Sequence, residues 1–245
     1  MKIALIGYGK MGQMIASVAR ERGHEIVCIV DHFVEIEQRL SGEIDSEAFR
    51  SADVAIEFTR PEAAEGNVRA AIAQGVPVVS GTTGWDTEAL KKDLSPALPS
   101  REGAKREADH PGIIWSSNYS IGVNILFAVN TYMARLLQNS GGYSPSITEV
   151  HHIHKLDAPS GTAKTLQEAI SGQQSAVSCP IESIREGEVP GIHEVRWESD
   201  ADILSLRHEA KSRQGFALGA VLAAEWLADK RGWHTLNEVL GLSAI

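Results

Sequence analysis

After Met1, the chain begins with the segment Lys2-Ile-Ala-Leu-Ile-Gly-Tyr-Gly-Lys-Met-Gly12, and this segment indicates the fold class. A short apolar run ends at Ile6, a Gly-x-Gly-x-x-Gly loop follows, and apolar residues then recur at helical spacing up to Gly23. A second apolar run begins at Glu25 and closes on Asp31. A glycine loop that follows a strand, opens a helix and precedes such an acid is the fingerprint of a β-α-β unit that binds a dinucleotide.

The glycine loop predicts where a nicotinamide cofactor would bind. Gly7 permits the tight turn, Gly9 lets the backbone approach the pyrophosphate, and Gly12 allows close packing of the helix. Asp31 would accept hydrogen bonds from the adenosine ribose and repel a 2′-phosphate, which favours NADH. Lys10 could offset that repulsion, so NADPH stays open. We expect cofactor contacts from the whole loop, which comprises Gly7, Tyr8, Gly9, Lys10, Met11 and Gly12.

The first half of the chain continues as alternating strand and helix patterns. Residues 52–59, 76–80 and 112–115 are apolar strand patterns, and Pro61 suits the first position of a helix. This alternation is typical of an α/β fold with a Rossmann-type, doubly wound parallel sheet. The segment 95–111 is polar with mixed charges, and we expect a solvated loop or a frayed helix there.

The richest chemistry lies in Glu149-Val-His-His-Ile-His-Lys-Leu-Asp-Ala-Pro-Ser-Gly-Thr-Ala163. A β-branched run leads into it and predicts a strand with the histidines at its end, and residues 157–159 break that strand. Ser160 is then the expected N-cap of a helix, so the amides of Gly161 and Thr162 would face outward at a helix end that attracts anions. Imidazole, ammonium and amide groups together predict a pocket for an acidic small molecule that must also be protonated.

Other interpretations of these histidines stay open. If the chain remained extended, His151 and Lys155 would share one face with His152 on the other, and they would flank a ligand. The rings could also be solvated side chains at a strand end. A zinc site is disfavoured because the spacing is not His-Glu-x-x-His, no acidic or cysteine partner is expected nearby, and Lys155 would repel the cation.

The residues around and after this motif predict a second, α+β domain. Strand patterns at 180–184, 192–197 and 203–208 predict a mixed or antiparallel sheet. An apolar helix at 215–227 precedes a short closing helix. The helix expected before the motif would bury one apolar face, made of Ile125, Leu126, Val129, Met133 and Leu136.

Composition limits the class of protein. The 245 residues carry a net charge of −9, from 23 basic and 32 acidic side chains, which argues against nucleic acid or an anionic membrane as a partner. The longest apolar runs are too short to span a bilayer. Met1 leads into a strand without a basic-then-apolar leader, and only two cysteines occur, so we expect a cytoplasmic protein.

Residues 151–163 are similar to the signature of the dihydrodipicolinate reductase family, and further motifs agree in family order. They are Phe58-Thr-Arg-Pro-Glu62, Gly81-Thr-Thr-Gly-Trp85 and an Asn-aromatic-Ser-x-Gly-Val-Asn segment that ends at Asn124. The resemblance implies NAD(P)H-dependent reduction of 4-hydroxy-tetrahydrodipicolinate to tetrahydrodipicolinate on the diaminopimelate route to lysine. It also implies a dinucleotide-binding domain at 1–120 and 216–245, a substrate-binding and oligomerisation domain at 121–215, and a homotetramer.

The resemblance further implies roles for individual residues. His151 would act as acid or base and Lys155 as the proton donor, on a small dicarboxylate held by His152, Gly161 and Thr162. An Arg-x-Gly…Gly-x-His pattern at 185–193 also resembles the family, but hairpin geometry explains its glycines equally well. The glycine loop is one residue shorter than the family usually shows, which leaves the phosphate contacts open. Additional cofactor contacts would come from Gly81, Thr82, Thr83, Ser116, Ser117, Asn118 and Tyr119.

Two rival functions remain. Another nicotinamide enzyme of the aspartate pathway could share this pattern, but a semialdehyde dehydrogenase needs an activated cysteine. Cys28 lies in a strand pattern, and Cys179 lacks an obvious base nearby. A dinucleotide-sensing protein without turnover would keep the glycine loop and Asp31, but it would not need the histidines and the lysine.

Overall fold

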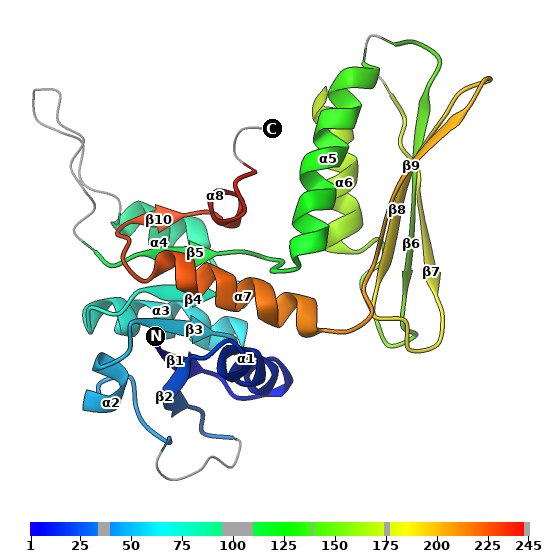
Figure 1. Ribbon diagram of the computed structural model, residues 1–245. Coiled ribbons are helices and arrows are strands. Elements are labelled where there is room, and N and C mark those ends of the chain that lie inside the picture. Colours follow the sequence, from blue (N-terminus) through cyan, green and yellow to red (C-terminus); the bar gives the residue numbers. More distant parts are fainter. Residues whose placement is uncertain (34–39, 95–109, 139, 174–176, 243–245) are drawn as a thin grey trace, which may run out of the picture. The chain divides into compact units, whose positions relative to one another are not determined.

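The computed structural model describes residues 1–33, 40–94, 110–138, 140–173 and 177–242. The chain forms two units: Met1–Tyr119 with Phe216–Gly241, and Ser120–Gly215 with Leu242 (Figure 1). Most of the charged segment at 95–111 lies outside the described residues. Within the described ranges, no helix is both long and apolar enough to cross a bilayer.

The first unit is built on a six-stranded sheet in the order β10-β5-β4-β3-β1-β2, and every neighbouring pair is parallel. The chain runs from β1 to β2 on one side and returns to β3 on the other, so the sheet is doubly wound as predicted. Its strands are β1 (Lys2–Ile6), β2 (Glu25–Val30), β3 (Val54–Glu57), β4 (Val78–Ser80), β5 (Ile113–Trp115) and β10 (Trp233–His234).

Helices cover both faces of this sheet, which explains why its strands are almost continuously apolar. One core cluster joins β1 to α1, α7 and α8, and a second cluster joins the other face of β1 to α2, α3 and α4. The helices are α1 (Lys10–Glu21), α2 (Glu47–Arg50), α3 (Pro61–Ala73), α4 (Thr87–Leu94), α7 (Gln214–Leu227) and α8 (Leu236–Val239).

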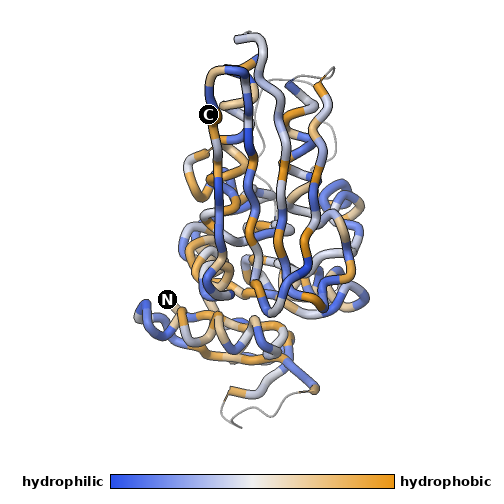
Figure 2. Tube along the Cα trace, turned by 90° about the vertical axis from the view of Figure 1, so that its right-hand side faces the viewer, coloured by the Kyte–Doolittle hydropathy of each residue, from blue (hydrophilic) through white to orange (hydrophobic). Residues whose placement is uncertain are grey.

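The second unit is a four-stranded sheet in the order β7-β6-β8-β9, with α5 and α6 on one face (Figure 1). β6 and β7 are parallel and the other pairs are antiparallel, so the predicted mixed sheet is confirmed. Figure 2 shows the alternation of hydrophilic and hydrophobic residues along these strands, as a sheet with one buried face requires. The elements are α5 (Ile121–Leu137), β6 (Ser144–His151), α6 (Gly161–Gln173), β7 (Ile181–Arg185), β8 (Ile192–Glu198) and β9 (Ile203–Glu209).

The buried face predicted for α5 is wrong. Ile125 and Leu136 are 46% and 56% exposed, Val129 is exposed as well, and of the predicted set only Leu126 is buried. The face that packs in this unit carries Asn130 instead, whose side-chain amide donates to the carbonyl of Leu166. Because apolar residues surround most of this helix, the spacing alone could not select the buried face.

β6 ends at His151, and the chain turns immediately afterwards. The amide of Lys155 donates to the carbonyl of His152, and that of Ile153 donates to Gly187. The extended arrangement considered for residues 151–155 is therefore absent. Lys155 belongs to a turn instead of sharing a strand face with His151.

Candidate active site

The glycine loop between β1 and α1 is shaped by close backbone contacts. Gly7 has φ +94°, and a Cβ there would lie 2.1 Å from the carbonyl oxygen of Phe58. A Cβ on Gly12 would lie 2.1 Å from the carbonyl oxygen of Gly7, so neither position accepts a side chain. Gly9 is different, because a Cβ there would meet nothing within 4 Å. Gly9 is the N-cap residue of the twelve-residue helix α1, and no side chain caps this helix by a hydrogen bond. The amino end of α1 is therefore open to an anionic group.

Asp31, at the carboxyl end of β2, is fixed beside this loop. Its Oδ2 accepts a hydrogen bond from the amide of Tyr8 at 2.6 Å, and its Oδ1 accepts one from the amide of Phe33 at 2.7 Å. The carboxylate therefore lies next to the glycine loop, as the Rossmann pattern predicts.

A groove of about 370 Å³ follows the carboxyl ends of β1, β3 and β4. It brings together parts of two loops predicted to bind the cofactor. It also includes Phe58, Thr59 and Pro61, which the sequence analysis did not assign to the site. They follow β3, so the rule that ligands bind at the carboxyl ends of parallel strands could have identified them. The lining residues are Gly9, Lys10, Met11, Phe58, Thr59, Pro61, Gly81, Thr82 and Thr83.

Beneath this groove, the carboxylate of Glu57 is buried among hydroxyl groups. Ser80 donates to Oε2 at 2.6 Å, Thr82 donates to Oε1 at 2.7 Å, and the hydroxyl of Thr59 also donates to Oε1. The side chain of Thr82 is therefore held by the protein, and Thr83 is exposed.

The third predicted cofactor loop, residues 116–119, is not part of that groove's lining. Tyr119 is buried, and its hydroxyl lies within hydrogen-bonding distance of the carbonyls of Ser80 and Ile114, at 2.9 and 3.2 Å. Burial raises the pKa of Tyr119 well above its usual value. Ser116 donates to the carbonyl of Asn118, and Ser117 is exposed. The ring of Tyr119 therefore anchors the loop inside the first unit.

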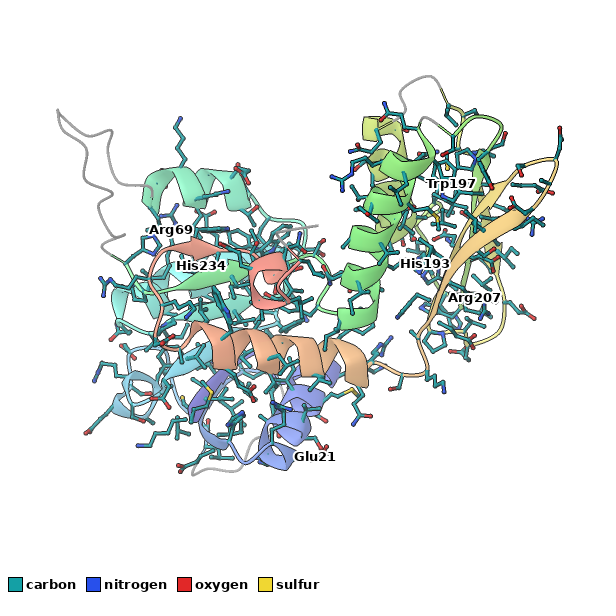
Figure 3. The ribbon with its side chains drawn as sticks, turned by 45° about the horizontal axis from the view of Figure 1, so that its top comes forward. Glu21, Arg69, His193, Trp197, Arg207 and His234 are labelled. Atoms are coloured by element: carbon teal, nitrogen blue, oxygen red, sulfur yellow. The ribbon has the colours of Figure 1, made fainter. Side chains whose placement is uncertain are left out.

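In the second unit, three strands deliver polar side chains to one buried place. Glu149 and His151 lie two residues apart on β6, so both face the helices. His193 on β8 is in register with Glu149, and Arg185 on β7 is in register with His151. Figure 3 shows His193 on the same strand as Trp197, and the two share the buried face of β8.

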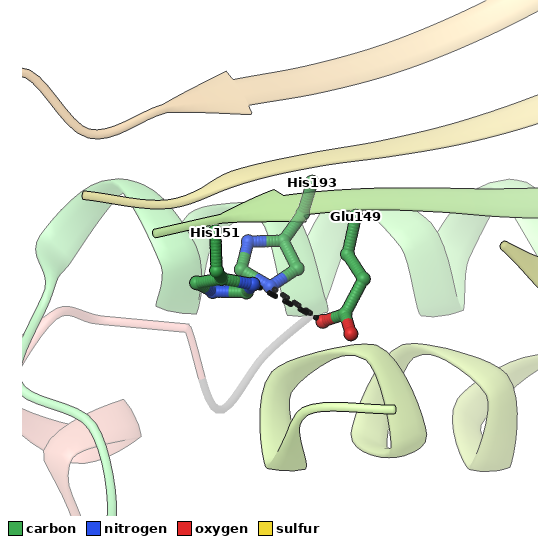
Figure 4. A group of neighbouring side chains, drawn as sticks. All are labelled: Glu149, His151 and His193. Carbon is green, nitrogen blue, oxygen red and sulfur yellow. Dashed lines mark ion pairs between the residues drawn. The ribbon is translucent and has the colours of Figure 1, made fainter. Parts of the chain in front are cut away.

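Glu149 is the centre of this group (Figure 4). Its Oε1 accepts hydrogen bonds from the amide of Ser160 at 3.0 Å and from Nη2 of Arg185 at 3.3 Å. Its Oε2 faces Nδ1 of His151 at 3.5 Å and Nε2 of His193 at 3.8 Å. We call Glu149, His151, His193 and Arg185 the Glu149 cluster. His151 was predicted to act as acid or base, and Arg185 and His193 were noted in a pattern that resembles the family. Their convergence on Glu149 was not predicted, although Glu149 and His151 are separated by the period of a strand.

Burial sets the charge state of the cluster. It lowers the pKa of His193 to about 4 and lowers that of His151, where Glu149 opposes the shift only in part. Burial acts to raise the pKa of Glu149, but hydrogen bonding from Ser160 and the neighbouring His151 hold it below its usual value. At neutral pH the cluster therefore contains an ionised carboxylate, a guanidinium and two neutral imidazoles.

The loop after β6 carries Lys155, whose ammonium group pairs with Asp157 at 2.7 Å. This hydrogen bond is the main reason that the pKa of Asp157 lies below its usual value. Arg185 donates to the carbonyls of Lys155 and Asp157, so one guanidinium fastens the loop and also neutralises Glu149.

Ser160 caps α6 as predicted, because its hydroxyl accepts a hydrogen bond from the amide of Ala163 at 3.2 Å. Gly161 and Thr162 form the first turn of this helix, with Gly161 exposed and Thr162 half-buried. His152 is half-buried and its ring lies 6.1 Å from that of His154. The helix end therefore offers backbone donors, and His152 and Lys155 belong to the loop that precedes it.

The expectation that no acidic partner lies near the histidines is wrong, because Glu149 does. Glu149, His151 and His193 each offer one ligand atom, and these atoms lie within 4.8 Å of one another. A metal ion there would face the guanidinium of Arg185, which already pairs with Glu149, and the ammonium of Lys155 would repel it. The positive charges around Glu149 therefore favour a carboxylate that interacts with two imidazoles over a carboxylate that binds a metal ion.

Comparison with known proteins covers nearly the whole chain. Residues 1–119 match the family model for the dihydrodipicolinate reductase N-terminus, and residues 122–240 match that for its C-terminus. A 4-hydroxy-tetrahydrodipicolinate reductase of Christiangramia forsetii is 43% identical, with 98% of each chain covered. One from Ralstonia nicotianae is 34% identical, with 99% of this chain and 100% of the relative covered. The solved dipicolinate-bound dihydrodipicolinate reductase from Paenisporosarcina has a similar fold, with a TM-score of 0.78 at 20% identity over 97% of this chain and 98% of that one.

Proposed function

This chain belongs to the dihydrodipicolinate reductase family, and we propose which of its residues bind the cofactor, bind the substrate and transfer protons. The reaction is the NAD(P)H-dependent reduction of 4-hydroxy-tetrahydrodipicolinate to tetrahydrodipicolinate on the diaminopimelate route to lysine. In this proposal the first unit holds the cofactor, and the second unit binds the substrate and manages its protons.

The first unit fits a dinucleotide in two respects. Gly9 leaves open space at the beginning of α1, where backbone N–H groups favour a pyrophosphate, and the adjoining groove offers room along Gly81 to Thr83. When bound, NAD(P)H supplies the hydride. The loop at Ser116–Tyr119 is proposed to contact the cofactor through its backbone and through the side chains of Ser117 and Asn118. The side chain of Tyr119 is buried and hydrogen-bonded inside the first unit.

We place NADH ahead of NADPH as the cofactor. The carboxylate of Asp31 is held by the amides of Tyr8 and Phe33, so it cannot easily move away from a bound adenosine ribose. A fixed negative charge there accepts hydrogen bonds from ribose hydroxyls and repels a 2′-phosphate. Lys10 is exposed in the same loop and would soften that repulsion without removing it.

His151 and Lys155 are the residues proposed to act on protons. His151 is neutral at physiological pH and sits in a buried environment, where it can accept or donate a proton. Lys155 carries a positive charge that suits a dianionic substrate, and it is the proposed proton donor. Its partner Asp157 is half exposed, so a substrate carboxylate could compete for the ammonium group.

The substrate carboxylates are proposed to bind at the first turn of α6. Gly161 and Thr162 present backbone donors at the positive end of a thirteen-residue helix, and His152 lies in the preceding loop. A dicarboxylate such as dipicolinate, which the Paenisporosarcina reductase binds, is a suitable probe for this site.

A homotetramer in the cytoplasm is proposed from the family resemblance. In this chain, the sheet of the second unit exposes apolar side chains on both edge strands, Ile184 on β7 and Ile203 on β9, and the register places both on the face opposite the helices. A sheet face of this kind is suited to burial against other copies of the chain.

The observation that carries the proposed function is the buried imidazole of His151 next to the cationic loop of Lys155 and the beginning of α6. Its test is the substrate-dependent loss of NADH absorbance, with substrate generated in situ, for wild type, His151→Ala and Lys155→Ala. Loss of an acid or base should reduce kcat by about 10²- to 10⁴-fold while NADH still binds. Lys164→Ala, which removes an exposed lysine from α6, is the matched control and should keep the wild-type rate. Wild-type protein that binds NADH without oxidising it in the presence of substrate would contradict the function.

A further inference from the structure

The two oxygens of Glu149 face different kinds of partner. Oε1 accepts hydrogen bonds from the amide of Ser160 and the guanidinium of Arg185, both of which keep their protons at all physiological pH values. Oε2 faces two imidazole nitrogens, Nδ1 of His151 and Nε2 of His193, and it has no hydrogen-bond partner among the described residues. The carboxylate is thus held by one oxygen and presents the other to groups that can exchange protons.

The position of Oε2 selects the tautomer of His151. A neutral imidazole carries its proton on one nitrogen and a lone pair on the other. Nδ1 of His151 is buried and lacks a hydrogen-bond partner among the described residues, apart from its approach to Oε2 at 3.5 Å. A lone pair on Nδ1 would face the negative oxygen, whereas a proton there would face it favourably. The proton therefore belongs on Nδ1, and Nε2 carries the lone pair.

The space beside Nε2 of His151 is kept open by a glycine. Gly191, which directly precedes β8, has φ +152°. A Cβ at this position would lie 3.2 Å from Nε2 and 3.4 Å from Cδ2 of His151. Any side chain there would crowd the nitrogen that carries the lone pair, so the glycine serves access to the ring as well as the turn.

We propose that Glu149 is a positioning residue for the reduction, which holds His151 with Nδ1 protonated so that Nε2 is the atom that exchanges a proton in the active site. Arg185 and the amide of Ser160 hold the carboxylate in place for this task. When Nε2 takes up or gives away a proton, the charge change falls on the imidazole, and Glu149 remains ionised throughout. This role rests on the proposed function of His151.

The charges around His151 set the expected pH dependence. Glu149 on β6 and Asp157 in the loop favour the protonated imidazole, while Arg185 on β7 and Lys155 disfavour it. His193 on β8, with His208 opposite it on β9, stays neutral because of burial. Glu149 is the closest of the favourable charges, so removing it should make His151 harder to protonate.

The experiment compares wild type with Glu149→Gln, which keeps the shape of the side chain and removes its charge. We expect kcat to fall by about 10-fold or more, since removing a partner that orients a metal-bound histidine costs about 10- to 100-fold and removing one that orients a catalytic histidine costs more. The limb of the kcat/KM profile that reports His151 should move to lower pH, while the affinity for NADH stays as in wild type. Glu168→Gln, which neutralises an exposed glutamate on α6, is the matched control and should change neither quantity.

A double-mutant cycle separates positioning from a general structural role. If Glu149 acts through His151, Glu149→Gln should cost little further activity in the His151→Ala background. Equal loss in both backgrounds, or a wild-type pH profile in Glu149→Gln, overturns the proposal while the reductase function stands. Absence of substrate-dependent turnover in wild type would instead refute the function. If Glu149→Gln does not fold, Glu149→Asp replaces it, since withdrawing the carboxylate should lower kcat, and an unchanged kcat overturns the proposal.

Discussion

The two units each bury one glutamate near the carboxyl end of a strand, and the two glutamates have different surroundings. Glu57 in the first unit and Glu149 in the second are both fully buried. The neighbours of Glu57 are the hydroxyl groups of Thr59, Ser80 and Thr82, whereas those of Glu149 include an amide, a guanidinium and two imidazoles.

This difference separates a structural carboxylate from one suited to proton chemistry. Hydroxyl groups do not titrate near neutral pH, so the neighbours of Glu57 keep their protons there, and Glu57 holds the side chains of Thr59, Ser80 and Thr82 in place. Imidazoles can change charge, so Glu149 can respond to a proton on His151 or His193. Burial alone is therefore a poor guide to function, and the titratable character of the neighbours is a better one.

The largest effect on stability is expected at the structural carboxylate. Glu57→Gln replaces an oxygen that accepts hydroxyl hydrogen bonds by an amide that cannot, and it should reduce the free energy of unfolding by about 3 kcal/mol. Chemical denaturation measures this loss. The KM for NADH should also rise, because Thr59 and Thr82 line the groove that we propose holds the cofactor. If the limb of the kcat/KM profile that reports His151 shifted in Glu57→Gln, Glu57 would also act on proton chemistry and the two glutamates would not differ in function.

The next effect concerns the pH dependence of stability in the second unit. His193 has its pKa lowered to about 4 by burial, whereas an unfolded histidine titrates near 6.5. Between these values the unfolded chain binds more protons, so stability falls as the pH drops from about 6.5 to about 4, by at most a few kcal/mol.

Replacing His193 by Asn should therefore reduce the slope of the melting temperature plotted against pH between about pH 4 and about pH 6.5. His32→Asn is the matched control, since that ring is largely exposed, and it should leave the wild-type slope. An unchanged slope in His193→Asn would show that this buried imidazole does not carry the pH dependence assigned to it.

The smallest effect is expected in the first unit, on the choice of cofactor. Asp31→Asn keeps an acceptor for the amide of Tyr8 and removes the charge that we propose repels a 2′-phosphate. The ratio of kcat/KM for NADH to that for NADPH should fall about tenfold, or about 1.4 kcal/mol. Asp53→Asn, at the amino end of the same sheet, should leave the ratio unchanged. An unaltered ratio in Asp31→Asn would assign the preference to another residue, such as Lys10.

Local patterns were sufficient for much of the fold. The glycine loop, the strands on either side of α1 and the cap at Ser160 depend on neighbours in sequence, and the structure confirms them. The packing face of α5 was missed because apolar residues surround that helix. Asn130 lies on the buried face, where its side-chain amide donates a hydrogen bond to Leu166 on α6, and this contact cannot be read from the spacing of apolar residues.

The candidate site was predictable only where it is local. His151 and Lys155 stand in one motif, but His193 and Arg185 reach Glu149 through the pairing of β8 and β7 with β6, which no spacing in the sequence reveals. Glu149 itself could have been recognised, because residues two apart on a strand share a face.

Nitrogen NMR of protein with isotope-labelled histidine locates the proton on His151. At neutral pH, we expect the signal of a protonated Nδ1 and an unprotonated Nε2 in wild type, and loss of that preference in Glu149→Gln. A wild-type His151 with its proton on Nε2 would contradict the proposal that Glu149 positions this imidazole.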